Sequence, residues 1–276
     1  MPKVDGSHAE RREASSSGLP GPPERDDGRL QVLGVAIADV FMSDAVEMVH
    51  DMLCRRDGCA RSVYFVNACA LNIAVSDRAY RDVLNAGDCV FGDGTGVRWA
   101  ARLRGIRLRD NVNGTDLVPA LFAATAGLGH RCFLLGADEE SIRLAAEHVA
   151  AAFPGWTLAG HHHGFLTTPE LDAQAVAKIN EARPDLLLVG MGNPLQERWI
   201  DAHRAQLAVP VVMGVGGLFQ YWAGTLRRAP RWLRSTGFEW LGILAQQPKK
   251  AKRYLIGNPL FLARILNEAR RQRREK

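Results

Sequence analysis

Polar residues that could do chemistry are concentrated in short loops that follow apolar runs of this 276-residue chain. The clearest loop is Gly92–Gly96, where Asp93 stands between two glycines. Because glycines allow a tight turn and the close approach of a ligand, Asp93 could act as a general base. Asp-Gly is also a common turn pair, so the local string is equally compatible with a turn or helix-capping role.

Three further loops offer amides and backbone N–H groups to a ligand. Their candidate substrate-binding residues are Asn67, Asn72, Gly190, Asn193, Gln196, Gly216, Gly217 and Gln220. Pro194 suits the first turn of a helix, where N–H groups could hold a phosphate while Gln196 reaches a sugar hydroxyl. An ordinary capped helix is the alternative at this loop.

Two other polar segments carry weaker signals. In residues 111–116, Asn113 or Asp116 could contribute to the same pocket, and Thr115 is a suitable N-cap for the helix that follows. His161, His162 and His163 suggest a metal, but alternate residues of an extended segment point to opposite faces. At most two of these histidines could share an ion, and no third ligand is evident, so we expect no metal site.

A nicotinamide dinucleotide site is disfavoured by the glycine spacing. The fingerprint G-x-G-x-x-G needs a third glycine, and Phe219 occupies that position after Gly214 and Gly216. The loop at Gly92 fails in the same way, because Val97 stands at the third position. A nucleotide phosphate resting against these loops remains compatible with the sequence.

Alternation of apolar runs with amphipathic stretches predicts an α/β fold for residues 30–224, a Rossmann-like parallel sheet covered by helices. The predicted strands are Gln31–Val35, Val63–Asn67, Asp88–Phe91, Arg131–Gly136, Thr157–Gly160, Asp185–Gly190 and Val211–Val215. The predicted helices are Ser43–Cys54, Asp77–Ala86, Asp116–Ala126, Glu139–Phe153, Pro169–Glu181 and Pro194–Gln206. Ligands of parallel sheets bind at the carboxyl ends of the strands, where the polar loops lie.

The two ends of the chain differ from this central domain. Residues 1–29 are rich in serine, glycine and proline, and we expect a disordered tail. Residues 225–276 hold fourteen Lys and Arg against three Glu, whereas the whole chain has a net charge of only +5. The basic character therefore belongs to one C-terminal helical appendage, which can face one partner.

Large apolar residues such as Trp240, Leu255 and Leu262 are interleaved with these charges, a pattern typical of a segment that docks on anionic lipid. No apolar run reaches the roughly 20 residues that span a bilayer, and no signal peptide is evident. No nucleic-acid-binding motif is recognised. We expect a cytoplasmic protein, peripheral on the inner face of the membrane; the oligomeric state, a homo-oligomer included, stays open.

Taken in order, these strings resemble the WecG/TagA/CpsF family of bacterial glycosyltransferases, glycosyltransferase family 26. The resemblance covers roughly Val32 to Leu266. Its motifs are Asn67…Asp77, Asp93-Gly94-x-Gly96, Val112-x-Gly114-x-Asp116-Leu117, Phe133-Leu134-Leu135-Gly136, His162-x-Gly164-Phe165, Gly190-x-Gly192-x-Pro194-x-Gln196-Glu197, Gly214-x-Gly216-Gly217-x-Phe219 and Arg228-Ala229-Pro230-Arg231-Trp232.

The resemblance implies transfer of a sugar from a UDP-sugar to a polyprenyl-diphosphate-linked sugar. It implies Asp93 as the catalytic base and Asn67 and Gln196 as polar pocket residues. It also implies an appendage that closes over the nucleotide diphosphate with arginines from the set Arg228, Arg231 and Arg234. No cofactor or divalent metal is expected.

Two departures bear on specificity: Phe65 stands where the family often has Thr, and Asn111 stands where it often has Arg. The strings around them are more similar to the exopolysaccharide, GumM-like branch, which adds glucose to a lipid-linked glucose. The expected reaction is therefore direct, inverting transfer of glucose or a related hexose. Two alternatives are a nucleotide-cofactor oxidoreductase and a non-catalytic member of a polysaccharide assembly complex.

Overall fold

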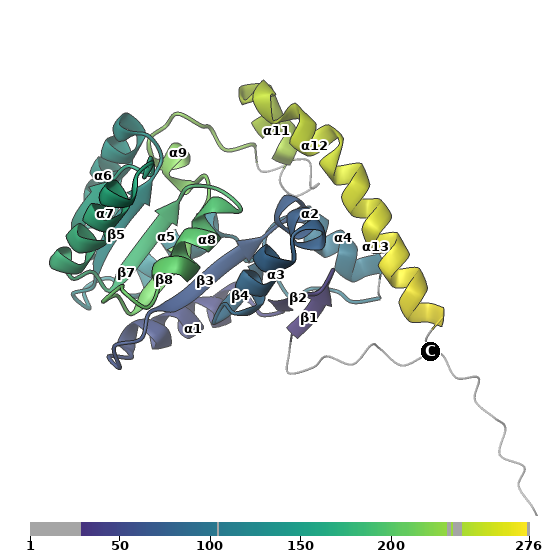
Figure 1. Cartoon of the computed structure of the whole chain (residues 1–276), viewed down its shortest axis with the longest axis horizontal. Helices are drawn as coiled ribbons and strands as arrows, with labels where there is room; N and C mark the ends of the chain where they lie inside the picture. Colours follow the sequence, from purple (N-terminus) through teal and green to yellow (C-terminus); the bar gives the residue numbers. More distant parts are fainter. Residues whose placement is uncertain (1–28, 104, 231–232, 234–238, 275–276) are drawn as a thin grey trace, which may run out of the picture.

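The computed structural model describes residues 29–103, 105–230, 233 and 239–274 (Figure 1). In this part of the chain, eight strands form one sheet in the order β1-β2-β4-β3-β8-β7-β5-β6. The β1–β2 pair is antiparallel and the other pairs are parallel. The strands are β1 Arg29–Val32, β2 Val35–Ala38, β3 Arg61–Val66, β4 Cys89–Gly92, β5 Arg131–Gly136, β6 Thr157–His162, β7 Leu186–Gly190 and β8 Val211–Gly214.

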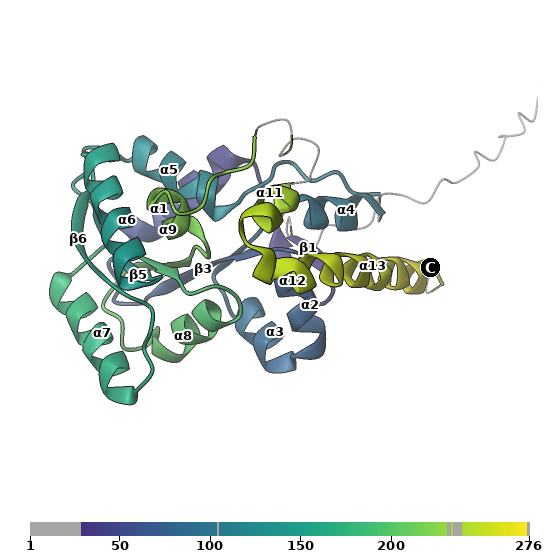
Figure 2. The ribbon, with the colours of Figure 1, turned by 90° about the horizontal axis from the view of Figure 1, so that it is seen from above.

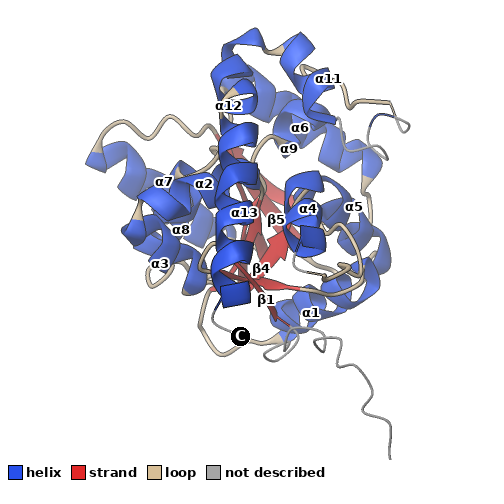
Figure 3. Ribbon diagram, turned by 90° about the vertical axis from the view of Figure 1, so that its right-hand side faces the viewer, coloured by secondary structure: helices blue, strands red, loops and turns tan. Residues whose placement is uncertain are grey.

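Helices cover both faces of the sheet, as the alternation of buried strand residues requires (Figure 3). Val63 and Phe65 of β3 pack into one core, whereas Tyr64 and Val66 pack into the other. One face is covered by α1 Met42–Cys54, α5 Gly114–Ala124, α6 Glu139–Ala152 and α9 Leu218–Trp222. The other is covered by α2 Ala68–Ser76, α3 Arg78–Asn85, α4 Thr95–Leu103, α7 Pro169–Ala182, α8 Leu195–His203 and α13 Gly257–Arg274. The predicted α/β class is confirmed.

The first strand of the prediction is instead a hairpin. Gln31–Val35 was expected as one strand, but the chain turns at Leu33 and Gly34 and returns antiparallel as β2. Both turn residues have positive φ, 50° and 81°, a conformation unusual for leucine. A leucine inside an apolar run gives no turn signal, which is why the sequence pattern missed this hairpin.

Asn and Asp side chains cap the first turn of several helices. Asn67 caps α2, a helix that was expected to be a loop, and its Oδ1 accepts hydrogen bonds from Cys69 N and Ala70 N. Asp77 caps α3, and its side chain accepts from Tyr80 N. Asn113 rather than Thr115 caps α5. In each case an Asn or Asp carries the cap, which agrees with the cap preference of these residues.

The C-terminal segment continues as α11 Glu239–Gln246, the 3-10 helix η1 Pro248–Lys250, α12 Ala251–Leu255 and α13. Figures 1 and 2 show α13 lying along α2 and α4. Phe261 and Ile265 of α13 are buried in the core of the domain. The last helix of the predicted appendage is therefore packed onto the sheet domain, while the predicted boundary near Gly224 stays a prediction.

Polar contacts fix α13 in this position. Asn72 Nδ2 donates to Gly257 O at 2.7 Å, and Arg264 Nη1 donates to Asn72 O at 2.7 Å and to its Oδ1 at 2.9 Å. Glu268 Oε1 accepts from Leu33 N at 3.0 Å. The predicted tail 1–29 lies outside the described residues except for Arg29. No helix among those described is both long and apolar enough to cross a bilayer.

Candidate active site

A cavity of about 670 Å³ lies at the carboxyl ends of β3, β4, β7 and β8, where the polar loops were expected to meet. The C-terminal helices complete its wall. Twelve of the predicted site residues line it: Asn67, Asp93, Gly94, Asn113, Asp116, Gly190, Asn193, Gln196, Gly216, Gly217, Gln220 and Arg228. The geometry therefore brings together side chains that are up to 161 positions apart in the chain.

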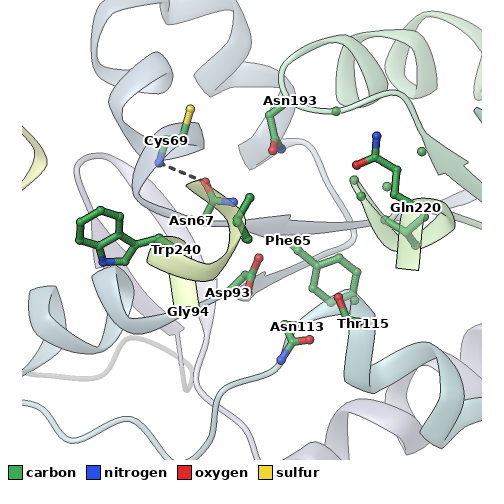
Figure 4. A pocket seen from close by; sticks show the side chains of 18 of the residues that line it. Phe65, Asn67, Cys69, Asp93, Gly94, Asn113, Thr115, Asn193, Gln220 and Trp240 are labelled. Atoms are coloured by element: carbon green, nitrogen blue, oxygen red, sulfur yellow. Dashed lines mark hydrogen bonds between the residues drawn. The ribbon is translucent and has the colours of Figure 1, made fainter. Parts of the chain in front are cut away.

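Asp93 and Asn67 stand next to one another in this cavity because their strands are neighbours in the sheet. Val66 of β3 is in register with Gly92 of β4, so the residues that follow them leave the sheet side by side. Asp93 N donates to Val66 O at 2.8 Å, which fixes the backbone at that point. Figure 4 shows both side chains in the pocket, and the Asp93 side chain is half-buried.

The loop after Asp93 is held by Asn111, whose Oδ1 accepts from Gly94 N at 2.7 Å. Gly94 has φ +86°, and a Cβ there would meet no atom within 4 Å, so the backbone conformation rather than crowding favours glycine. Asn111 also lines the cavity. In the sequence, Asn111 is visible only as a departure from the family pattern, because the spacing of the motifs does not indicate its contact with Gly94.

Asn113, Asp116 and Arg228 form a polar cluster at the N-terminus of α5. Asn113 Oδ1 accepts from Asp116 N at 3.0 Å, and its Nδ2 donates to Asp116 Oδ2 at 2.8 Å. Arg228 donates from Nη1 to Asp116 Oδ1 at 2.5 Å and from Nη2 to Asp116 Oδ2 at 2.8 Å. This fork-to-fork geometry orients Arg228 more strictly than a single contact would.

Gln196 has a different role from the one predicted. Its side chain is buried, and its Oε1 accepts from Gly192 N at 3.1 Å and from Gly216 N at 3.0 Å. Its Nε2 donates to Glu197 Oε1 at 2.8 Å. Gln196 thus joins the loops after β7 and β8. This contact with two loops differs from the predicted contact with a sugar hydroxyl, and a phosphate held at the first turn of α8 stays a prediction.

Two predicted site residues do not line the cavity. Asn72 is engaged with Gly257 and Arg264, where it fastens α2 to α13. Gly136 has φ +145°, and a Cβ there would lie 2.4 Å from Gly190 O. The close approach of β5 to β7 therefore requires glycine at 136. Both residues lie outside the lining of the cavity and pack against elements that form it. The predicted Arg231 and Arg234 lie outside the described residues.

Sequence reasoning missed several lining residues because no short motif marks them. From α4, Arg98 and Trp99 enter the wall, and from the C-terminal helices Trp240, Tyr254 and Leu262 do so. In Figure 4, Trp240 lies on the side of the cavity next to Asn67. The alternation of aromatic and basic residues in this segment predicted a lipid surface, and part of it instead faces the cavity.

The histidine run lies apart from this site. His161, His162 and His163 line a second, smaller cavity with Glu139 and Lys178. Burial, with Lys178 nearby, lowers the pKa of His161 below its usual range. Among the described residues, no three His, Cys, Asp or Glu side chains are arranged to hold a metal ion. That no metal is needed stays a prediction.

The main cavity combines a half-buried carboxylate, several amides and aromatic walls, a set suited to a polar ligand with hydroxyl groups. Among the described residues that line it, the cations are Arg98 and Arg228. A carboxylate can accept a hydroxyl proton, and cations can stabilise a departing anion. These are the requirements of group transfer to a hydroxyl.

Comparison with known proteins agrees with this chemistry. The model of the glycosyl transferase WecG/TagA/CpsF family matches residues 30–275. The N-acetylglucosaminyldiphosphoundecaprenol N-acetyl-beta-D-mannosaminyltransferase of Staphylococcus aureus (strain MW2) is 29% identical over 248 residues, 90% of this chain and 96% of the relative. The protein of the same name from Bacillus subtilis (strain 168) is 30% identical over 200 residues, 72% of this chain and 77% of the relative. Since the family match spans every loop of the cavity, the chain belongs to the WecG/TagA/CpsF family of glycosyl transferases.

Proposed function

We propose that the protein transfers a sugar, with inversion, from a UDP-sugar to a sugar linked to polyprenyl diphosphate. The observation that carries the proposal is the position of Asp93, beside Asn67 in the main cavity at the carboxyl ends of two neighbouring strands. The family match and the printed activity of the relatives support the reaction type. Neither alternative, a nucleotide-cofactor oxidoreductase or a non-catalytic subunit, is favoured by these relatives.

In the proposed reaction, a carboxylate oxygen of Asp93 accepts the proton of the acceptor hydroxyl as that oxygen attacks the anomeric carbon. The bond between the anomeric carbon and the diphosphate oxygen breaks, and its electron pair leaves with UDP. Arg98 supplies positive charge on the cavity wall for the departing diphosphate. Arg228, paired with Asp116, ties the segment after α9 to the cavity, where Arg231 and Arg234 are proposed to complete the donor site.

For the donor, N-acetylmannosamine is the first candidate, because the S. aureus and B. subtilis relatives are named for its transfer. Glucose, expected from the GumM-like strings, is the second candidate, and the exopolysaccharide branch has no support from these relatives. Phe65 bears on the choice, since it lines the cavity and packs so closely on Gly114 that a Cβ there would lie 3.1 Å from its ring. An apolar wall at this place accommodates a methyl or C–H face of a sugar rather than a hydroxyl.

Peripheral attachment to the inner face of the cell membrane is part of the proposal. Leu255, Ile256 and Leu260 of the C-terminal helices are exposed, at 58%, 59% and 43%. Lys249 and Lys252 lie on the same stretch of chain, and the pairing of exposed apolar side chains with cations suits an anionic lipid surface. The acceptor is itself lipid-linked in the relatives, by their names.

A release assay tests the proposed function directly. UDP release is measured for UDP-N-acetylmannosamine, UDP-glucose and other UDP-sugars, with and without a lipid-linked N-acetylglucosamine diphosphate acceptor. We expect acceptor-dependent release with one donor and a product that carries one more sugar. Absence of acceptor-dependent release with every UDP-sugar, by folded protein, would reject the proposal.

A further inference from the structure

Glu197 is a fully buried carboxyl group beside the site, and the proposed reaction gives it no role. It lies in the first turn of α8, with an exposed fraction of 0%. Its Oε1 accepts from Asn193 Nδ2 at 2.5 Å and from Gln196 Nε2 at 2.8 Å. A buried glutamate is costly, so its presence calls for a specific arrangement of partners.

The two amides that Glu197 holds have separate connections to the cavity. Asn193 lines the cavity itself and is visible there in Figure 4. Gln196 accepts from Gly192 N and Gly216 N, so it connects the loop after β7 with the loop after β8. One carboxyl group therefore fixes a side chain in the cavity and, through Gln196, the backbone of two loops that line it.

The orientation of the Gln196 amide is fixed by its hydrogen-bonding partners. A Cβ at Gly214 would lie 2.9 Å from Gln196 Nε2, so that amide is packed against the end of β8. If its Nε2 and Oε1 exchanged places, two N–H groups would face the Nε2 of Gln196, and Glu197 Oε1 would face an oxygen. Glu197 thus selects the one orientation in which Gln196 Oε1 can accept from both loops.

The second carboxyl oxygen, Oε2, is buried and makes no hydrogen bond within the described part of the chain. The Tyr80 hydroxyl is also buried without a hydrogen-bond partner in the described part of the chain, and it is close enough to Glu197 for the two groups to influence one another electrostatically. Burial raises the pKa of the Glu197 carboxyl above its ordinary value, so a neutral carboxyl group suits this position. A proton on Oε2 would also leave the lone pairs of Oε1 for the two amides.

We propose that Glu197 is a positioning residue for the nucleotide-sugar donor, acting through Asn193 and through the Gln196 clamp on the β7 and β8 loops. Asp93 serves the acceptor hydroxyl from the half of the sheet that holds β4. The loops after β7 and β8 line the same cavity from the other half of the sheet, and in this proposal they contact the donor together with Arg98. The inference rests on the proposed function for the identity of that donor.

Three variants test this role: Glu197→Ala, Glu197→Gln and the control Glu181→Ala, which removes an exposed glutamate of α7. Loss of the carboxyl leaves two buried amide donors without an acceptor, so we expect Glu197→Ala to raise the KM for the UDP-sugar about tenfold or more. The kcat should fall less than the KM rises. Glu197→Gln keeps Oε1 and places an N–H donor at the Oε2 position, so it should restore the donor KM to within about threefold of wild type.

Hydrogen–deuterium exchange of the same variants gives a readout that needs no substrate. Peptides covering residues 190–197 and 214–220 should exchange faster in Glu197→Ala and return to the wild-type rate in Glu197→Gln. If the wild-type protein releases no UDP from any donor, the proposed function fails, and the exchange rates still decide whether Glu197 holds the loops. Unchanged exchange rates together with an unchanged donor KM in Glu197→Ala would overturn the inference. It would also be overturned if Glu197→Gln raised the donor KM and the exchange rates as much as Glu197→Ala does.

Glu197→Ala could unfold the protein, so Asn193→Ala serves as a second test. Asn193 is half-buried and its loss removes one of the two amides that Glu197 orients. We expect the same rise in donor KM, with the exchange of the 214–220 peptide unchanged because the Gln196 clamp remains. A normal donor KM in a folded Asn193→Ala protein would contradict the positioning role.

Discussion

Arg228 binds both carboxylate oxygens of Asp116, through contacts of 2.5 and 2.8 Å that join residues 112 positions apart. Asp116 lies in the first turn of α5 and is itself held by Asn113. The contact therefore fastens the segment that leaves α9 to the rim of the main cavity. Together with the buried Leu226 and Ala229, it holds the chain that leads to Arg231 and Arg234 against the sheet domain.

Replacing Arg228 by Lys should strongly lower the rate of UDP release but only slightly lower the free energy of unfolding. A lysine cannot make the two-pronged contact with Asp116, so the segment loses its fixed position. The pair is partly exposed, at 29% and 40%, so its loss should cost about 1 kcal/mol or less of unfolding free energy. We expect UDP release to fall about tenfold, with Arg227→Lys, at an exposed neighbour, as the matched control. Equal activity of the two variants would contradict this role.

The exposed apolar side chains of the C-terminal helices should be needed for lipid binding. Deleting residues 225–276 is a poor test, because Phe261 and Ile265 of that segment are buried in the core. The triple variant Leu255→Ser, Ile256→Ser and Leu260→Ser leaves that packing intact. In flotation assays, we expect the triple variant to bind phosphatidylglycerol vesicles at least about tenfold more weakly than the wild type, with an unchanged melting temperature.

Leu128→Ser is the control for that experiment. Leu128 is equally exposed, at 58%. It precedes the amino end of β5, whereas the cavity lies at the carboxyl ends of the strands. Its replacement should leave vesicle binding unchanged. Binding that survives the triple substitution, or that is lost equally with Leu128→Ser, would show that the C-terminal surface does not dock on lipid.

Glu197 should make the protein less stable as the pH rises. Burial raises its folded-state pKa above the ordinary value of 4.5, so above that pH the unfolded chain releases this proton while the folded protein retains it. The unfolded state then binds fewer protons, and the free energy of unfolding falls with increasing pH. Glu197→Gln removes this dependence, so its stability relative to wild type should increase between pH 5 and pH 8 in urea titrations. A difference that is constant across this range would show that the carboxyl is ionised in the folded protein.

Gly136→Ala should be strongly destabilising although Gly136 does not line the main cavity. A Cβ there would lie 2.4 Å from a backbone oxygen of Gly190, which cannot move without separating β5 from β7, and the φ of +145° is itself unfavourable. We expect a loss of about 3 kcal/mol or more of unfolding free energy. Gly129→Ala is the control, because Gly129 has φ +77° but open space around it, and only about 1–2 kcal/mol of strain is expected.

The layered fold and most of the cavity could be predicted from sequence because parallel strands bring their carboxyl ends to one edge. Asn67 and Asp93 each follow a strand directly, Asn193 comes three residues after β7, and the parallel strands bring all three to one end of the sheet. The hairpin at Leu33 could not be predicted, since a leucine at positive φ gives no turn signal.

The roles of three residues depended on contacts that no local string encodes. Asn72 was expected in the pocket, and it instead fastens α2 to a helix about 190 positions away. Gln196 was expected to contact a sugar hydroxyl, and its side-chain oxygen instead accepts hydrogen bonds from the backbone of two loops. Glu197 is the next residue along the chain. Its side chain is buried because α8 packs against the sheet, a tertiary contact that the local sequence does not indicate.

Asp93 is proposed as the base of a glycosyl transfer, and turnover by the Asp93→Asn variant is the decisive measurement. UDP release with a UDP-sugar and a lipid-linked acceptor is compared between wild type and the variant, with circular dichroism as the check on folding. Because base assistance contributes about 10²- to 10⁴-fold, the folded variant should lose activity by that factor while still binding UDP. Turnover near the wild-type rate by Asp93→Asn would show that Asp93 is not the base.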